Sequence, residues 1–545
     1  MKNVILIVLD GWGIAPPGPG NAVTLANTRY INSLYDKYPY TRLQASGEAV
    51  GLPEYEAGNT EVGHINLGAG RIVYQDLPRI NMSIADGNFY KNTALLKSFS
   101  HLRRTGGKLH VMGLVGVGTV HSSIDHLYAL LYFAKENNMG EVYIHVITDG
   151  RDSPPKSSVE IVARLDEKLL QLGIGKVATI MGRYYAMDRD RRWERTREAY
   201  NCLVQGTGIK CGSVTDALNH AYDEGRTDEF ILPKNICQQG RPVALIAEGD
   251  AVIFFNYRID RPRQLTKAFV LDNFEEEANR TLSFDPYAVK YYKTHQPKSE
   301  ILTPPFQRGN KIKDLLFITM TEYEEGLPVD VAFPPSIVYS PIGKVLADHH
   351  LKQLRMSESE KERFVTYYFN GQNEDVFPNE ERLIIPSPKV ATYDVKPDMS
   401  SAQLTDVAIQ KILENKYEFI LLNYANPDMV GHTGNIDASI RAVESVDRCL
   451  GKLIPTALNT NYSILVTADH GNVEQKINFK TGKTSTEHTS NMVPFIAISK
   501  DLEGRNVNIP TGILADVAPT ILALMGLQKP HEMTGRNLLE QFRAA

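Results

Sequence analysis

The chain has 545 residues, which is too long for one ordinary hydrophobic core and suggests several domains. Apolar residues make up 42% of it and charged residues 23%, proportions that exclude a disordered or fibrous protein. The formal net charge of -5 argues against a broad nucleic-acid-binding surface, so any anion site must depend on local clusters of arginine.

The first apolar run, Val4 to Leu9, is short and ends at Asp10 without a signal-peptide cleavage site. It lacks polar alternation, which is typical of a strand buried on both faces of a parallel sheet. No apolar run approaches the length of about 18 residues that spans a membrane, so we expect a cytoplasmic protein. Four cysteines lack the spacing of a zinc site and are expected to be reduced, buried thiols. They are Cys202, Cys211, Cys237 and Cys449.

The stretch from Gly58 to His64 places one hydroxyl, that of Thr60, among glycines and polar side chains. Glycines allow the backbone to approach a ligand closely, and a threonine can act as a nucleophile if its pKa is lowered. The alternative is an ordinary helix start capped by Asn59 or Thr60. Residues far away in the sequence favour the nucleophile.

In the middle of the chain, apolar runs alternate with helical segments at Ser122 to Asn138 and Ser157 to Leu172, which predicts a parallel or mixed sheet. Each run ends in polar side chains, mostly arginine. The pairs are Leu109 to Val115 before His121, Val142 to Ile147 before Arg151 and Asp152, Lys176 to Met181 before Arg183 and Arg189, and Ala251 to Asn256 before Arg258 and Arg261. Arginine binds carboxylate or phosphate through paired hydrogen bonds, so these ends predict an anion site. The alternative is a solvated rim of salt bridges.

Two stretches interrupt the pattern of strands and helices. Residues 279–313 are rich in Tyr, Lys and Pro and are expected to form a surface excursion. Residues 321–335 carry Gly326, Pro328, Pro334 and Pro335 and are expected to be a linker between domains.

In the last third of the chain, the strand ends carry Asp and His instead of Arg. Asp428 and His432 lie four residues apart and therefore on one face of a helix, although such a pair is often merely a polar surface pair. Asp469 and His470 follow another apolar run, and His488 precedes one. With Asp10, these side chains can hold two divalent cations, and mixed carboxylate and imidazole ligands suit manganese, with zinc or cobalt as alternatives.

Taken together, these short sequence motifs resemble those of the cofactor-independent phosphoglycerate mutases, a family of the alkaline phosphatase superfamily. The match runs nearly end to end. The motifs are Asp10 to Gly13, Gly58 to His64, Val120 to Ser122, Asp149 to Asp152, Gly182 to Asp190, Arg258 to Arg261, Pro386 to Tyr393, Asn426 to His432, Thr467 to Asn472 and His488 to Asn491.

The resemblance implies an α/β fold in which both chain ends, residues 1–76 and 321–545, form a phosphatase-like domain that holds two metal ions. A second α/β domain, at 77–320, would be inserted to bind phosphoglycerate. The implied protein is an isomerase of glycolysis and gluconeogenesis that uses two Mn²⁺ ions, or Co²⁺ or Zn²⁺, and no 2,3-bisphosphoglycerate. It would be a monomer whose partner is its small-molecule substrate, without nucleic acid or membrane.

The resemblance also implies roles for single residues, by matching motif positions. One metal ion would be held by Asp428, His432 and His488, and the other by Asp10, Asp469, His470 and the Thr60 oxygen. Lys361 would assist at the phosphate, and Asp152 would carry a proton. The implied substrate-binding set is His121, Arg151, Asp152, Arg183, Arg189, Arg258, Arg261 and Lys361.

The chain departs from the family at Thr60, where the family usually has Ser. Threonine keeps the hydroxyl but adds a methyl group and restricts χ1, so we expect a phosphothreonine intermediate. Two rival functions stay open. A phosphohydrolase of the same superfamily would share the metal ligands but release inorganic phosphate, and a non-catalytic sensor of metal and phosphate would not need the nucleophile.

Overall fold

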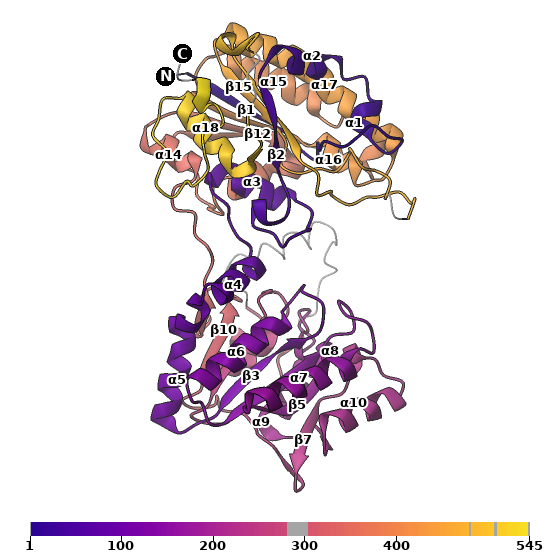
Figure 1. The fold of residues 1–545 in the computed structure, drawn as a ribbon, viewed down its shortest axis with the longest axis vertical. Helices are drawn as coiled ribbons and strands as arrows, with labels where there is room; N and C mark the ends of the chain where they lie inside the picture. The colour runs from indigo at the N-terminus through magenta and orange to yellow at the C-terminus, as the bar shows by residue number, and fades with distance from the viewer. Residues whose placement is uncertain (1, 281–302, 479–480, 506–508, 543–545) are drawn as a thin grey trace. The chain divides into compact units, whose positions relative to one another are not determined.

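The structure is a computed structural model that describes residues 2–280, 303–478, 481–505 and 509–542. It divides into two compact units (Figure 1). The first unit consists of residues Met1–Pro78 and Ser336–Ala545, and the second consists of Arg79–Pro335. Both ends of the chain therefore belong to the first unit, and the second unit is an insertion in it.

A mixed sheet forms the centre of the first unit. Its strand order is β13 (Glu380–Ile385), β12 (Gln353–Glu358), β14 (Phe419–Tyr424), β1 (Val4–Leu9), β15 (Ser463–Thr467), β16 (Val493–Ile498), β2 (Tyr40–Gln44) and β17 (Gly512–Ile513). The strands from β13 to β15 are parallel, whereas β16 is antiparallel to β15. The predicted first strand is thus confirmed, and it occupies an interior position where every side chain is buried.

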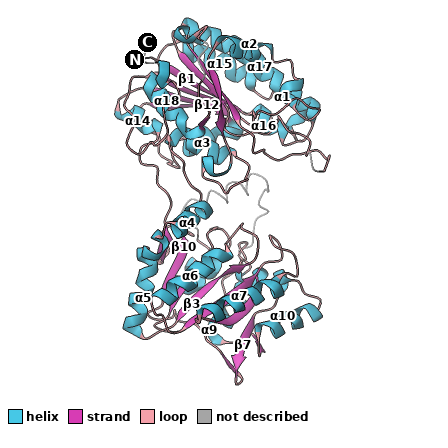
Figure 2. Cartoon of the chain, in the orientation of Figure 1, coloured by secondary structure: helices cyan, strands magenta, loops and turns pink. Residues whose placement is uncertain are grey.

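Helices cover both faces of this sheet (Figures 1 and 2). They are α1 (Ala22–Leu25), α2 (Arg29–Lys37), α3 (Thr60–Ala69), α14 (Ile342–Asp348), α15 (Ser401–Leu413), α16 (Asn426–Gly431), α17 (Ile436–Asn459) and α18 (Val517–Leu524). The apolar side chains of β1, β14 and β15 form the core of the unit together with buried residues of α17.

A second, separate sheet forms the centre of the inserted unit. Its strand order is β11 (Asp330–Phe333), β10 (Leu316–Thr321), β9 (Ala251–Phe254), β3 (Leu109–Val115), β4 (Val142–Thr148), β5 (Lys176–Gly182), β7 (Lys234–Gln238) and β6 (Ile209–Cys211), and β8 (Arg241–Pro242) pairs with β7. The strands from β11 to β5 are parallel. Parallel strands bring their carboxyl ends to one edge, so the polar residues that follow them gather there.

The inserted unit also contains helices, the first of which begins at the boundary between the two units. They are α4 (Asp76–Ala85), α5 (Thr93–Thr105), α6 (Ile124–Glu136), α7 (Ser158–Leu172), α8 (Arg183–Ala186), α9 (Trp193–Gln205), α10 (Val214–Asp223), α11 (Arg263–Val270) and α12 (Phe274–Glu277). The two helices predicted between strands are confirmed as α6 and α7. Gly173 ends α7 with a left-handed φ of 68°, as its sequence position predicts.

The linker predicted at 321–335 is wrong in part. Gly326 and Pro328 do lie in a loop, but Asp330–Phe333 forms β11 and pairs in parallel with β10. A strand of four residues is too short to show the periodicity of a strand, and the prolines that follow it made the whole stretch resemble a linker. The chain returns to the first unit only at Ser336.

The surface excursion predicted at 279–313 lies partly outside the described residues, at 281–302. Where it is described, the prediction is wrong for Phe306 and Arg308, which are both buried. Phe306 packs into the core of the inserted unit. Arg308 Nη1 donates to the carbonyl oxygens of Ala268, at 3.2 Å, and Leu271, at 2.5 Å.

The cysteines are free thiols, as expected, but only Cys202 and Cys449 are buried, and Cys211 and Cys237 are half-buried. Among the residues that the structure describes, no helix combines the length and the apolar character needed to cross a membrane.

Candidate functional site

The Asp and His residues singled out in the last third of the chain meet Asp10 at one edge of the first sheet. Asp10, Asp428 and Asp469 follow the carboxyl ends of the neighbouring parallel strands β1, β14 and β15. His488 precedes the antiparallel strand β16, whose amino end lies at the same edge. Lys361 ends the short helix η4 (Ser359–Lys361), which follows β12. Strand order thus assembles residues that lie hundreds of positions apart.

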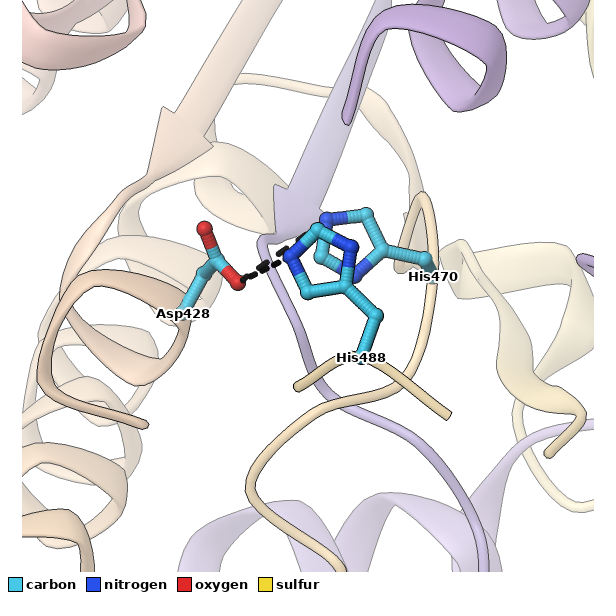
Figure 3. A group of neighbouring side chains, drawn as sticks. All are labelled: Asp428, His470 and His488. Carbon is cyan, nitrogen blue, oxygen red and sulfur yellow. Dashed lines mark ion pairs between the residues drawn. The ribbon is translucent and has the colours of Figure 1, made fainter. Parts of the chain in front are cut away.

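The assembled side chains are close enough to share cations. His488 Nε2 lies 3.2 Å from Asp428 Oδ1, and His470 Nε2 lies 3.9 Å from the same oxygen (Figure 3). His470 Nε2 also lies 3.5 Å from Asp10 Oδ1 and 3.5 Å from Asp469 Oδ2. Asp428 Oδ1 lies 3.3 Å from His432 Nε2. The rings of His470 and His488 are stacked with their centroids 3.9 Å apart, and together with Asp428 they form one group. His470 also belongs to a second group, with Asp10 and Asp469.

The three imidazoles are oriented in the same way, as metal ligands are. In each, Nδ1 faces a backbone carbonyl oxygen: that of Gly58 for His488, at 2.9 Å, that of Thr486 for His432, at 2.8 Å, and that of Gly471 for His470, at 3.2 Å. A carbonyl oxygen only accepts, so each Nδ1 carries a proton. Each Nε2 then faces the carboxylates, where it can coordinate a cation once it has lost its proton, and the donor set fits divalent cations.

The electrostatics of the buried cluster favour positive charge. Burial alone raises the pKa of Asp428, but the ammonium group of Lys361 and the nearby imidazoles hold it well below its usual value. Burial lowers the pKa of His470, yet Asp469 and Asp10 raise it to about 9. The carboxylates therefore stay ionised in a region of low dielectric constant, where they attract cations strongly.

Thr60 lies within this cluster and is 5% exposed. Its Oγ1 is 2.9 Å from His470 Nε2 and 3.0 Å from Lys361 Nζ. It is also the first residue of α3, whose cap is Asn59: the Asn59 Oδ1 accepts from the backbone N–H of Val62 at 3.0 Å. The helix start and the reactive position are therefore compatible, because the cap holds the hydroxyl at the amino end of a helix, which favours nearby negative charge.

Gly63, in the motif around Thr60, lies against another part of the protein backbone and not against space for a ligand. A Cβ atom there would lie 2.6 Å from the carbonyl oxygen of Asp469. Only glycine lets the first turn of α3 pack against the loop that carries Asp469 and His470. This differs from the expectation that the glycines of this motif leave room for a ligand.

A second polar group forms at the carboxyl edge of the sheet in the inserted unit. Arg151, Arg183, Arg189 and Arg261 line a cavity of about 190 Å³. Burial, together with the charges of Arg189 and Arg183, lowers the pKa of Arg261. The neighbouring guanidinium groups thus add to the effect of burial, and positive charge gathered around a cavity favours an anion.

Carboxylates hold these arginines in place. Arg183 Nη1 donates to Asp149 at 2.5 Å and to Asp152 at 2.6 Å. Asp260 accepts from Arg189 at 2.8 Å and from Arg258 at 3.1 Å. An arginine that is hydrogen-bonded to a carboxylate can adopt fewer rotamers, so its guanidinium group is already oriented when a ligand binds.

His121 lies between two of these carboxylates. Its Nε2 is 3.9 Å from Asp152 and its Nδ1 is 3.9 Å from Asp260. Burial and the nearby Arg183 lower the pKa of His121 to about 3, so the imidazole is neutral near pH 7. Its buried Nδ1 has no hydrogen-bond partner among the described residues.

Comparison with known proteins agrees with this geometry. A family model described as the BPG-independent PGAM N-terminus matches residues 80–325, and the sulfatase family model matches residues 321–527. A 2,3-bisphosphoglycerate-independent phosphoglycerate mutase of Clostridium beijerinckii is 46% identical to the chain, over 99% of both sequences. The chain belongs to the family of 2,3-bisphosphoglycerate-independent phosphoglycerate mutases. It is therefore an enzyme of the isomerase class.

Other phosphoglycerate mutases support the assignment. The enzyme of Moorella thermoacetica is 47% identical over 99% of this chain and 98% of its own length. A crystal structure of the Leishmania mexicana phosphoglycerate mutase at low cobalt concentration matches 98% of this chain and 97% of its own, with a TM-score of 0.58 and 28% identity. The predicted fold class is confirmed, with a phosphatase-like part built from both chain ends and an inserted α/β part.

The structure brings the predicted metal ligands together in the first unit, and it brings the predicted arginines and His121 together in the second. Two groups of residues could each hold a metal ion, because within each group the ligating atoms lie within 4.8 Å of one another. The groups are Asp428, His470 and His488, and Asp10, Asp469 and His470. His470 belongs to both groups, whereas the sequence assigns it to one ion.

The sequence analysis did not identify the residues that hydrogen-bond to the predicted site residues and orient them. In the first unit, Asn423 Nδ2 donates to Asp10 at 2.8 Å, and His64 Nδ1 lies 3.3 Å from Asp469. In the second, Arg151 Nε donates to Glu229 at 2.7 Å. His64 stands in a motif that the sequence had singled out, but nothing in the residues around Glu229 marks it.

Proposed function

We propose that the enzyme interconverts 3-phosphoglycerate and 2-phosphoglycerate, in glycolysis and gluconeogenesis, through a phosphothreonine at Thr60. The observation that carries the proposal is the position of the Thr60 hydroxyl. It lies 3.0 Å from the ammonium group of Lys361 and 2.9 Å from His470, inside a buried cluster of carboxylates and imidazoles. Nucleophiles of covalent catalysis occur in such surroundings, within hydrogen-bond distance of groups that take their proton or stabilise their charge.

The donor atoms described above support two divalent cations, with manganese preferred and cobalt or zinc as alternatives. Asp428, His432 and His488 would hold one ion. Asp10, Asp469, His470 and the Thr60 oxygen would hold the other. When bound, such ions lower the pKa of a hydroxyl and neutralise the charge of a transferring phosphoryl group.

The chain's own residues then divide the work of the transfer. Thr60 Oγ1, having lost its proton to solvent, attacks phosphorus, the bond between phosphorus and the substrate oxygen O3 breaks, and O3 takes a proton from Asp152. Lys361 neutralises the charge on the phosphoryl oxygens. The hydroxyl on carbon 2 of glycerate next attacks the phosphothreonine and gives its proton back to Asp152, and the bond between phosphorus and Thr60 Oγ1 breaks. Thr60 and Asp152 thus return to the states in which they began. Because the phosphoryl group stays on the chain between the two steps, the reaction needs no 2,3-bisphosphoglycerate.

The inserted unit would bind the glycerate part of the substrate. Its arginines match the planar carboxylate with paired donors, and a neutral His121 can hydrogen-bond a hydroxyl without adding charge. Retention of glycerate between the two steps is what separates a mutase from a phosphohydrolase, which releases the alcohol.

The test is conversion of 3-phosphoglycerate to 2-phosphoglycerate by purified enzyme with manganese and without 2,3-bisphosphoglycerate. The expected result is isomerisation with little inorganic phosphate. Release of inorganic phosphate without 2-phosphoglycerate would indicate a phosphohydrolase, and no turnover at all with any of the three metals would indicate a sensor.

A further inference from the structure

One buried carboxylate, that of Glu474, joins the loops that carry three of the proposed metal ligands. Its Oε2 accepts from the backbone N–H of Gly13 at 3.1 Å and from that of Asn472 at 2.7 Å. Its Oε1 accepts from the Asn491 side chain at 2.9 Å and from the hydroxyl of Thr489. Glu474 is only 1% exposed, so these donors replace its hydration.

The donors to Glu474 stand next to metal ligands in the sequence. Gly13 lies three residues after Asp10, Asn472 lies two after His470, and Thr489 follows His488 directly. Asp10 and His470 follow β1 and β15, His488 precedes β16, and both oxygens of Glu474 are occupied by these donors. A single side chain therefore fixes the separation of three loops whose ligating atoms have to converge.

The loops approach this carboxylate as closely as a backbone allows. A Cβ atom on Gly13 would lie 2.3 Å from the carboxyl carbon of Glu474. Glycine is needed at this position for the loop after Asp10 to reach the carboxylate. The fit is specific to a carboxylate, because all four of its neighbours are donors and an amide in its place would direct two of its own hydrogens at some of them.

The same network reaches a fourth ligand. Asn472, whose N–H is held by Glu474, donates from its side-chain Nδ2 to Asp428 Oδ1 at 2.7 Å. Asp428 is the carboxylate shared by three imidazoles in the cluster. Glu474 is therefore connected, through one backbone contact, to the orientation of Asp428 as well.

We propose that Glu474 is a positioning residue that sets the distances between the metal-ligand loops before the cations bind. The inference rests on the proposed function, since it concerns the affinity for those cations. Without this carboxylate, the incoming ions would have to order the three loops themselves, and the free energy of ordering would be lost from binding. Partners behind metal ligands typically change the affinity about 10- to 100-fold when they are removed.

The decisive experiment measures manganese affinity, by competition with a fluorescent chelator, for the unmodified enzyme, Glu474→Gln and Glu487→Gln. Glu487 is exposed and precedes His488, so its variant controls for the loss of a negative charge in the same loop. We expect affinity about 10- to 100-fold weaker for Glu474→Gln and nearly unchanged for Glu487→Gln. In the mutase assay, Glu474→Gln should need more manganese for half-maximal activity but recover most of kcat at saturation.

The results that would overturn the inference are distinct. A Glu474→Gln enzyme with native affinity for manganese and a lower kcat would show a merely structural role, and the proposed function would stand. If the unmodified enzyme bound no divalent cation, the proposed function would fail together with the inference. If Glu474→Gln does not fold, Thr489→Val removes one donor with little change of shape. It should weaken manganese binding in the same direction by a smaller factor, and native affinity in that variant would refute the inference.

Discussion

The ammonium group of Lys361 donates a hydrogen bond to the Thr60 hydroxyl over 3.0 Å, and both side chains are buried. Burial lowers the pKa of Lys361, but Asp10 and Asp428, each 2.7 Å from Nζ, raise it above its usual value. Lys361 is therefore a permanent positive charge beside the proposed nucleophile. It can stabilise negative charge on the hydroxyl or on a phosphoryl group bound to it.

Substitution of Thr60 tests whether its hydroxyl is the nucleophile. Thr60→Val keeps the branched shape and loses only the hydroxyl, so we expect turnover to disappear. Thr60→Ser should keep it, because only the hydroxyl forms the covalent bond. Mass spectrometry of enzyme quenched with substrate should find the phosphoryl group on the peptide that contains residue 60. A phosphoryl group on another residue, or an active Thr60→Val enzyme, would refute the phosphothreonine.

Removal of metal tests the two-cation proposal. Activity should disappear after exhaustive treatment with EDTA and return best with manganese, because the donor set combines carboxylates with imidazoles. Asp10→Asn alters the group with Asp469 and His470 and leaves the Asp428 group intact. Metal analysis after dialysis should therefore find one of the two ions lost in this variant. Full activity in excess EDTA would exclude the proposal.

Stability of the inserted unit should depend on pH through its buried histidines. Burial lowers the pKa of His126 to about 4, whereas histidine in an unfolded chain titrates near about 6.5. Between these values the unfolded state binds more protons, so the free energy of unfolding should fall as the pH drops from about 6.5 to about 4. The loss from this residue amounts to at most about 3 kcal/mol.

Denaturant unfolding between pH 7 and about pH 4.5 measures this effect. The chain has 2 tryptophans, and Trp193 lies in the inserted unit, so a Trp12→Phe background makes fluorescence report on that unit. His126→Gln keeps a donor for Asn81, which accepts from His126 Nε2 at 2.8 Å, and should reduce the slope with pH. His220→Gln changes an exposed histidine and should not. Equal slopes in all three proteins would contradict the burial argument.

Much of the fold could be predicted because several interior strands are continuous apolar runs that end in polar residues. Val4 to Leu9 and Leu109 to Val115 coincide with β1 and β3. The strand order could not be predicted from the residues alone, since it depends on pairing between segments hundreds of residues apart, such as Leu9 with Tyr424. The resemblance to a family supplied the missing long-range information.

The residues that orient the site side chains through hydrogen bonds were harder to predict from the sequence than the site side chains themselves. Asp260 stands in the same motif as Arg258, so their proximity in sequence was a usable signal, whereas Asp149 pairs with Arg183, which lies in another motif. Glu474 follows Asp469 and His470 by a few residues, and a carboxylate beside a buried strand end needs partners. Glu229 stands in η3 (Asp228–Phe230), where no periodic pattern or motif marks it, and only the fold brings it to Arg151.

The last prediction concerns Arg258, which we assign to the glycerate part of the substrate. Its Nε is 3.1 Å from Asp260, and Arg189 contacts the other oxygen of that carboxylate at 2.8 Å. Arg258→Ala therefore leaves Asp260 paired and should remove mainly a contact to the ligand. An arginine-to-carboxylate contact is worth roughly 1.5 to 3 kcal/mol, about one to two decades in retention of bound glycerate.

Glycerate should escape more often from the phosphorylated Arg258→Ala enzyme, and water would then take the phosphoryl group from Thr60. The ratio of inorganic phosphate to 2-phosphoglycerate should rise by about one to two decades relative to the unmodified enzyme. Arg197→Ala, a change of an exposed helical arginine, should leave this ratio unchanged. The ratio of inorganic phosphate to 2-phosphoglycerate distinguishes a role in binding glycerate from a role in binding the phosphoryl group, whereas the overall rate does not. If the ratio stays constant while the rate falls, Arg258 serves the phosphoryl group or the fold, because a weakened contact to glycerate should release more of the intermediate.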